Sequence, residues 1–251
     1  MKRIFAWTAA VIGVVVVGGF AYIWFSGGSG EPSTEITTPT IPTATDDPAA
    51  PGTSTPDATT GPTTVPTDAG GTVSFVIDNA QSTAIFLIDE TLRGSPNRVE
   101  GTTNELAGQV AVDPSDLSTA QLSEIVVNGR TFATDSSFRD RAIRGPVILN
   151  SADDQFEFIS FQPTEITGLS GAASVGDEVT FQVTGDLTVK GVTNSETFDV
   201  TVTFATESTI EGEATATVNR DDYGIGIPNA PGVADVSEEV EIRLVFVAVA
   251  G

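Results

Sequence analysis

The sequence contains no cysteine and no histidine, and its only methionine is the first residue. Without cysteine, the chain has no disulfide framework, no thiol nucleophile and no zinc–thiolate site. Without histidine, it has no histidine general base, no histidine-based catalytic triad and no histidine metal ligand. These absences exclude much of hydrolytic and redox chemistry. Carboxylate pairs, as in glycosidases, and a serine–lysine arrangement are the enzymatic alternatives that remain.

Basic residues are scarce as well, with 11 Lys and Arg against 34 Asp and Glu and a formal net charge of −23. Such a chain repels phosphate, so we expect no nucleic-acid partner. The same charge disfavours docking of the acidic domain flat on an anionic bilayer. The paired acids at 153–154 and 221–222 are typical of solvated turns, and no calcium-loop motif is present. We therefore expect no metal and no cofactor.

A long uncharged run occupies residues 4–25 and follows Lys2 and Arg3. As a helix, these residues would extend about 33 Å, against a hydrocarbon core of about 30 Å. Aromatic residues near both ends suit the membrane interfaces, and the preceding cations predict a cytoplasmic N-terminus. A cleaved signal peptide is the alternative, but this run is longer than its usual apolar region and ends in bulky residues. We predict an uncleaved signal-anchor in residues 1–25, which makes the protein a single-pass cell-membrane protein with the remainder extracytoplasmic.

Residues 26–71 contain eight of the 14 prolines, 13 threonines and no aromatic residue. A segment of this composition cannot bury a core, and proline favours extended polyproline conformations. We predict a disordered Thr/Pro-rich linker that acts as a semi-stiff stalk, about 40 Å long as a coil and about 140 Å if fully extended. Its threonines suit O-glycosylation, and an unmodified spacer is equally compatible with the composition.

Residues 72–251 hold nearly all of the remaining apolar bulk and predict one globular domain. Apolar and polar residues alternate along much of it, as in strands with one wet face. The predicted strands are 72–78, 82–91, 106–112, 122–128, 156–162, 179–189, 197–204, 209–219 and 239–246. A short helical stretch is predicted near 136–143. The domain is therefore predicted to be all-β and antiparallel, with about eight or nine strands in a barrel or a sandwich.

Five segments along the domain form a series. They read FVIDNAQS at 75–82, FRDRAIR at 138–144, TGDLTVKGVT at 184–193, ATVNRDDYGI at 216–225 and VEIRL at 240–244. The series resembles the YceI-like family, and its most specific parts are the hairpin at 184–193 and the turn at 219–224. The resemblance implies an extended, lipocalin-like antiparallel β-barrel of about eight strands. It further implies that an apolar tunnel holds a long isoprenoid chain, and it implies binding rather than catalysis.

The chain departs from the family pattern where the family usually carries histidine. Gln81 occupies one such position, and the segment 139–144 reads RDRAIR where the family has Arg-Asp-x-His-Leu-Arg. Residues 145–147 replace an aromatic pair of the family. Head-group contacts that depend on those histidines are therefore absent, and the resemblance does not identify the ligand.

The phenylalanine-rich faces of the strands supply candidate lipid-binding residues. A closed eight-stranded barrel is either filled by its own side chains or holds a small ligand, and periodicity alone does not separate the two. A polyisoprenoid exposes only methyl and methylene surface, and its removal from water is worth about 25 cal/mol per Å². The candidates on the apolar faces are Phe156, Phe158, Phe161, Phe181, Val183, Phe198, Val200 and Phe204.

Three of the scarce cations fall within six positions, namely Arg139, Arg141 and Arg144. Because a guanidinium matches phosphate and carboxylate geometry, the cluster is a candidate for contact with an anionic or quinone head group at the barrel mouth. The alternative is that these arginines pair with nearby aspartates and fix a loop. The aspartates in question are Asp135, Asp140, Asp153 and Asp154.

The sequence therefore predicts a membrane-anchored domain that binds a long apolar lipid, polyisoprenoid or quinone-like, as an extracytoplasmic carrier, store or sensor. The main alternative is a stalked adhesion or envelope structural domain with a filled β core and no small-molecule ligand. A carbohydrate-active enzyme would need two carboxylates about 5–10 Å apart across one cleft. We expect no enzymatic activity and no catalytic residues. The partners are the lipid and, through the N-terminal helix, the membrane, and the sequence leaves room for a homodimer.

Overall fold

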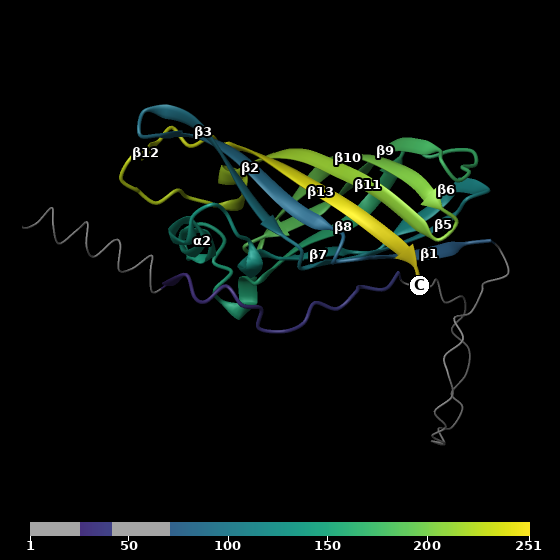
Figure 1. Cartoon of the computed structure of the whole chain (residues 1–251), viewed down its shortest axis with the longest axis horizontal. Helices are drawn as coiled ribbons and strands as arrows, with labels where there is room; N and C mark the ends of the chain where they lie inside the picture. The colour runs from purple at the N-terminus through teal and green to yellow at the C-terminus, as the bar shows by residue number, and fades with distance from the viewer. Residues whose placement is uncertain (1–25, 42–70) are drawn as a thin grey trace, which may run out of the picture.

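The computed structural model describes residues 26–41 and 71–251 of the chain (Figure 1). The predicted anchor, residues 1–25, and the greater part of the predicted linker lie outside the described residues. Within the part that is described, no helix combines the length and the apolar character needed to cross a membrane. The anchor therefore stays a prediction from sequence.

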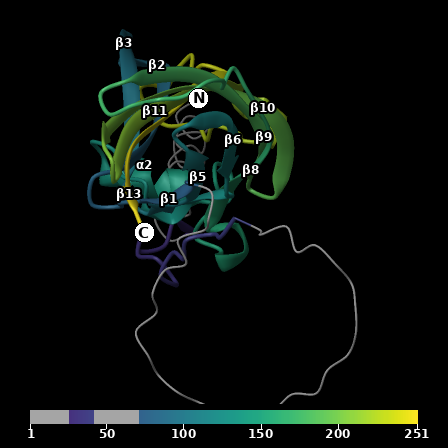
Figure 2. The same ribbon diagram turned by 90° about the vertical axis from the view of Figure 1, so that its right-hand side faces the viewer.

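The domain is built on one antiparallel sheet. Its strands are β1 (Val73–Ile77), β2 (Thr83–Leu92), β3 (Ser95–Thr103), β4 (Leu106–Ala107), β5 (Gln109–Asp113), β6 (Asp116–Leu122), β7 (Ile125–Asn128), β8 (Phe158–Thr167), β9 (Glu178–Val189), β10 (Val192–Thr206), β11 (Thr209–Asn219), β12 (Val233–Ala234) and β13 (Glu239–Ala250). The main path runs β4-β7-β8-β9-β10-β11-β13-β1-β5-β6, and β2 joins β13 to β3 and β12. Figure 2 shows the sheet curled around a central interior. The predicted all-β, lipocalin-like fold is confirmed as a curled, half-barrel sheet.

Period-two alternation explains why the long strands curl with one face inward. In β10, Phe198, Val200, Val202 and Phe204 are buried, and the residues between them are more exposed. Phe198 pairs with Val183 of β9, so apolar side chains of neighbouring strands share the inner face. A sheet with one apolar face must cover it, and curling does so without a second layer.

The structure has more strands than the eight or nine predicted. The alternation missed β3, β6 and β12. The strands β3 and β6 are edge strands rich in polar residues, and β12 is only two residues long. Edge strands have fewer apolar neighbours and often carry polar residues, so the apolar pattern is weak there. The predicted strand 106–112 is also interrupted at Gly108, where a Cβ atom would lie 2.2 Å from Ile125 Cδ1. Close packing at this glycine separates β4 from β5.

The β9–β10 hairpin closes with the two residues Lys190 and Gly191, which have φ values of 53° and 76°. Two consecutive positive φ values are typical of the two-residue turns that match the right-handed twist of strands. Val189 and Val192 therefore pair directly across the turn. The sequence predicted a hairpin at 184–193, and the structure places its turn at residues 190 and 191.

Short helices gather at one end of the half-barrel. They are α2 (Ser137–Arg144), η1 (Gly129–Thr131), η2 (Asp154–Phe156) and η3 (Arg220–Tyr223). The Ser136 side chain accepts a hydrogen bond from Arg139 N at the start of α2, and the helix ends at Gly145. This helix confirms the helical stretch predicted at 136–143. Figure 1 places α2 and β12 at the end opposite β5 and β6.

Residues 26–41, which we call the strap, lie against the outside of the domain. Figure 1 shows the strap starting beside α2 and running below the sheet. The Gly27 carbonyl accepts a hydrogen bond from Arg144 Nε at 2.7 Å, and the Ser33 amide donates to Glu157 Oε1 at 2.9 Å. These residues belong to the predicted linker 26–71, and no local pattern in the sequence indicates these contacts.

Candidate functional site

A cavity of about 760 Å³ occupies the interior of the half-barrel. This volume falls within the 300–1,000 Å³ that is usual for small-molecule sites. Aliphatic and aromatic side chains from β2, β5, β7 and the strands β8 to β13 supply most of its lining. The interior is thus hollow, which the alternation of residues could not decide.

Six of the eight predicted lipid-binding residues line this cavity. They are Phe161, Phe181, Val183, Phe198, Val200 and Phe204. The rings of Phe161 and Phe198 meet edge to face, with centroids 4.9 Å apart. All six except Phe181 are buried, at 8% exposure or less. Their contact with a lipid stays a prediction.

The other two predicted residues, Phe156 and Phe158, are not among the residues that line the cavity. Phe156 belongs to η2, not to a strand, and its ring lies next to Gly191 in the β9–β10 turn. Phe158 begins β8, where Ile159 and Phe161 point inward, so the alternation directs Phe158 to the other face. The prediction put residues 156, 158 and 161 on one face, although even-numbered and odd-numbered residues of a strand face opposite sides.

The cavity opens at the end where α2 lies. Among the described lining residues, the three that are exposed are Arg93, Ile227 and Pro231. They belong to the β2–β3 turn and the loop before β12, which are joined by a hydrogen bond from Arg93 N to Gly232 O at 2.6 Å. At the opposite end, Leu117 and Ile210 line the cavity and are each only 3% exposed. We call the end where these exposed lining residues lie the open end of the cavity.

Glu90 and Arg139 bring charge to the open end, and both line the cavity. Arg139 Nη2 lies 3.2 Å from Glu90 Oε1, and Asn97 Nδ2 donates to the same oxygen at 2.9 Å. Arg139 also pairs with Asp135. This arrangement agrees with the alternative in which arginines of the cluster pair with nearby acids. Contact between Arg139 and a head group remains untested.

Glu90 is not among the site residues predicted from the sequence, although its position in β2 indicates that it points into the cavity. In β2 the lining residues Ala84, Phe86, Ile88 and Leu92 share one parity with Glu90. An acid on the apolar parity of a strand points inward and requires a polar partner. The partner, Arg139, lies 49 residues away in sequence, so only the fold could identify it.

The two remaining arginines of the cluster do not line the cavity. Arg144 is 7% exposed and donates from Nε to the strap carbonyl of Gly27. Burial lowers the pKa of Arg144, although Asp140 opposes the shift. The guanidinium stays charged, because arginine is not deprotonated in proteins at ordinary pH. The structure therefore divides the cluster, with Arg139 at the cavity and Arg144 under the strap.

Tyr223 is the buried polar residue of the family-like turn and lines the cavity. It is 1% exposed, and its hydroxyl donates to Glu196 Oε1 at 2.8 Å. Burial and the neighbouring Glu196 raise the pKa of the phenol well above its ordinary value. The side chain is therefore neutral, and its hydroxyl is committed to Glu196 and not to the cavity interior.

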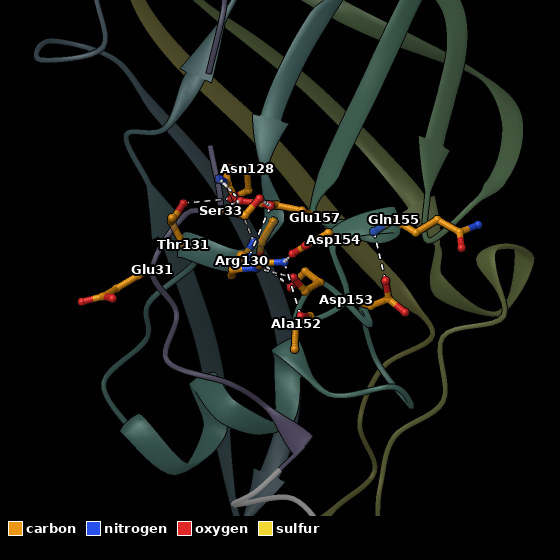
Figure 3. A network of polar contacts seen from close by, with 12 residues as sticks. Glu31, Ser33, Asn128, Arg130, Thr131, Ala152, Asp153, Asp154, Gln155 and Glu157 are labelled. Carbon is orange, nitrogen blue, oxygen red and sulfur yellow. Dashed lines mark hydrogen bonds and ion pairs between the residues drawn. The ribbon is translucent and has the colours of Figure 1, made fainter. Parts of the chain in front are cut away.

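A second polar centre joins the strap to the domain (Figure 3). Glu157 is fully buried at 0% exposure and accepts from Asn128 Nδ2 at 2.8 Å. The amide and hydroxyl of Ser33 donate to its two carboxylate oxygens, and Arg130 Nη1 lies 3.4 Å away. Burial raises the pKa of Glu157, but hydrogen bonds from Ser33 and Asn128 and the charge of Arg130 together hold that pKa below its ordinary value. The carboxylate is therefore ionised at neutral pH.

We expect the contribution of the strap contact to depend on pH. Because the folded-state pKa of Glu157 is lowered, the ionised carboxylate stabilises the fold fully above the ordinary pKa of about 4.3. This stabilisation is lost as the pH falls through the folded-state pKa. At pH 7, Ser33→Ala should lower the free energy of unfolding by about 1–2 kcal/mol. At pH 2 the same substitution should have little effect.

Thermal unfolding of the detergent-solubilised chain at both pH values measures this difference. Thr37→Ala, at an exposed position of the strap, is the control and should be neutral at both. An equal effect of Ser33→Ala at pH 7 and pH 2 would contradict the assignment.

Comparisons with known proteins agree with this geometry. The YceI-like domain family matches residues 75–248. A UPF0312 protein of Staphylococcus aureus strain N315 is 27% identical over 163 residues, which cover 62% of this chain and 85% of that protein. The homologue of strain MSSA476 is 28% identical over 163 residues, which again cover 62% of this chain and 85% of that protein.

Two solved structures share the fold. BcnA of Burkholderia cenocepacia has a TM-score of 0.52 and 21% identity, with 68% of this chain and 98% of that chain covered. A polyisoprenoid binding domain from Saccharophagus degradans, implicated in plant cell wall breakdown, has a TM-score of 0.57 and 13% identity, with 71% and 99% covered. Because the family match covers residues 75–248, well over half of the chain and the whole of the cavity wall from β8 to β11, the chain belongs to the YceI-like domain family.

Proposed function

We propose that the protein binds a long apolar lipid of the polyisoprenoid or quinone-like class inside the half-barrel. The observation that carries this proposal is the cavity of about 760 Å³ with its apolar lining. Each methylene group moved from water into such a lining contributes about 0.8 kcal/mol, so a long chain is bound without any directional contact. The polyisoprenoid binding domain of Saccharophagus degradans has the same fold, which supports this ligand class.

The open end favours a polar head group without strong negative charge. Arg139 is engaged by Glu90 and Asp135, so a pyrophosphate would have to compete with two carboxylates for one guanidinium. A hydroxyl or a quinone carbonyl needs only one hydrogen-bond donor and carries no charge that must displace these carboxylates. Within the proposed class, we therefore favour polyprenols and quinones over polyprenyl pyrophosphates.

We further propose that the protein acts at the cell membrane as an extracytoplasmic carrier, store or sensor, and not as an enzyme. The uncharged run at 4–25, with cations before it, supports this placement. The alternative of an adhesion or envelope domain rests on a filled β core, and the hollow interior speaks against it. A homodimer remains an expectation that no observation addresses.

Native mass spectrometry of residues 26–251 tests the ligand directly. The chain, purified from a bacterial host without organic solvent, is expected to carry one lipid per polypeptide, identified after extraction. If the native lipid is lost in purification, the linear polyprenol solanesol should bind with one-to-one stoichiometry. A mass equal to the bare polypeptide, together with no uptake of solanesol or a quinone, would overturn the proposal.

A further inference from the structure

The strap fixes the start of the described chain on α2. Gly27 is buried, and a Cβ atom there would lie 2.2 Å from the carbonyl oxygen of Arg141, so only glycine fits this approach. The carbonyl of Gly27 is held by Arg144 Nε at 2.7 Å. Residue 26 is therefore anchored at the helix and does not hang on a free linker.

The same helix forms one wall of the open end of the cavity. The residues of α2 that line the interior include Phe138, Arg139 and Ala142. Gly27 packs against the backbone of Arg141 in the same helix. An α-helix with its side chains is about 10–12 Å across. The point where the chain reaches residue 26 thus lies about one helix diameter from the cavity.

Apolar side chains are exposed around this opening. Of the six exposed large hydrophobic residues in the described ranges, three lie here, namely Val147, Ile227 and Val192, at 39%, 36% and 38% exposure. Gly226 N donates to Val147 O at 3.1 Å, and Lys190 Nζ donates to Val147 O at 3.2 Å, which brings the three segments together. We call Val147, Val192 and Ile227 the rim.

Residue 26 follows directly on the uncharged run 4–25, whose length matches a bilayer. If that run is the anchor, the strap holds the rim and the opening at the point where the chain leaves the membrane. A free stalk that began at residue 26 would instead place the opening at a distance from the membrane. Lys190 and Arg93 beside the opening also reduce the local repulsion that the acidic domain has from a bilayer.

We propose that the rim is a membrane-docking surface and that the open end of the cavity faces the phospholipid bilayer. This inference rests on the proposed function, because it makes the bilayer the place from which the ligand enters and to which it returns. An apolar chain then moves between two apolar environments without crossing water. The strap is the part that maintains this orientation.

Single cysteines test the orientation, since the chain has none of its own. Ile227→Cys places an environment-sensitive fluorophore on the rim, and Val175→Cys places it in the β8–β9 turn at the opposite end, where Val175 is 55% exposed. The full chain is reconstituted into phosphatidylcholine vesicles that carry a spin-labelled quencher near the head groups. We expect a blue shift and several-fold stronger quenching at 227 than at 175.

A strap variant makes the test specific. Gly27→Ala forces the strap away from α2, so quenching at 227 should fall to the level seen at 175. Thr37→Ala, exposed in the same strap, should leave it unchanged. Equal quenching at 227 and 175, or chains that do not float with the vesicles, would overturn the inference.

Solanesol uptake by the unlabelled full chain separates this inference from the proposed function. Uptake with equal quenching at both positions would leave the proposed function standing and reject the docking surface. Strong quenching at 227 without uptake would support the docking surface and reject the proposed ligand.

Discussion

Replacing Ala214 with phenylalanine is expected to weaken lipid binding by at least about tenfold while the domain stays folded. Ala214 lies on β11 opposite Val200 of β10, and both line the cavity. A ring at this position occupies space that the ligand needs. Displacing only two methylene groups costs about 1.6 kcal/mol, which corresponds to about a tenfold loss of affinity. Solanesol binding, followed by native mass spectrometry and by titration, measures the change.

Val245→Phe provides the matched control. Val245 pairs with Glu213 on β11, one position from Ala214, but it is 39% exposed and faces away from the cavity. The same kind of enlargement there should leave binding unchanged. Equal losses in the two variants, or unchanged binding in Ala214→Phe, would show that the ligand does not occupy the interior.

Removing the carboxylate of Glu157 should be the most destabilising single change at the strap. Glu157→Ala leaves Arg130 and Asn128, both buried, without their shared acceptor. Breaking a buried pair from one side costs about 3–5 kcal/mol, and the lower end applies because Arg130 retains Asp154 at 2.7 Å. A loss of about 3 kcal/mol corresponds to a Tm lower by about 6–12 °C in a domain of this size.

Thermal unfolding of the parent and two variants checks this value. Glu165→Ala, which removes an exposed glutamate from β8, should change Tm by no more than about 1–2 °C, as surface substitutions usually do. A Tm for Glu157→Ala within that same range would mean that the Glu157 centre contributes nothing to stability. If the prediction holds, Glu157→Ala should also release the strap, because Ser33 loses its acceptor, and proteolysis near Ser33 would detect this release.

Local pattern predicted most of the fold but not its edges. Period-two alternation in 179–189 and 239–246 has a direct physical cause, because a strand with one buried face must place every second side chain inward. The edge strands β3 and β6 lack that constraint and were missed. Phe158 shows the limit within a strand, since a shift of one residue in parity moves a side chain to the opposite face.

Some features of the candidate site were likewise predicted from the sequence, and others were revealed only by the fold. Phe181, Val183, Phe198 and Val200 were predicted from alternation and do line the cavity. The pairing of Glu90 with Arg139 at the open end joins groups 49 positions apart, so only the fold could reveal it. The division of the arginine cluster between cavity and strap likewise depends on which face of α2 each residue occupies.

By itself, the sequence determined the all-β class, the family resemblance, the apolar inner faces and an N-terminal run long enough to span a bilayer. Composition and short-range periodicity encode these features, because each follows from residues close together in the chain. Only the tertiary structure decided that the interior is hollow, which end is open, and that residues 26–41 are held against the domain by the contacts of Gly27 with α2 and of Ser33 with Glu157. A cavity is set by how distant side chains fill a shared volume, and the Ser33–Glu157 contact spans 124 residues, so no local pattern could specify either.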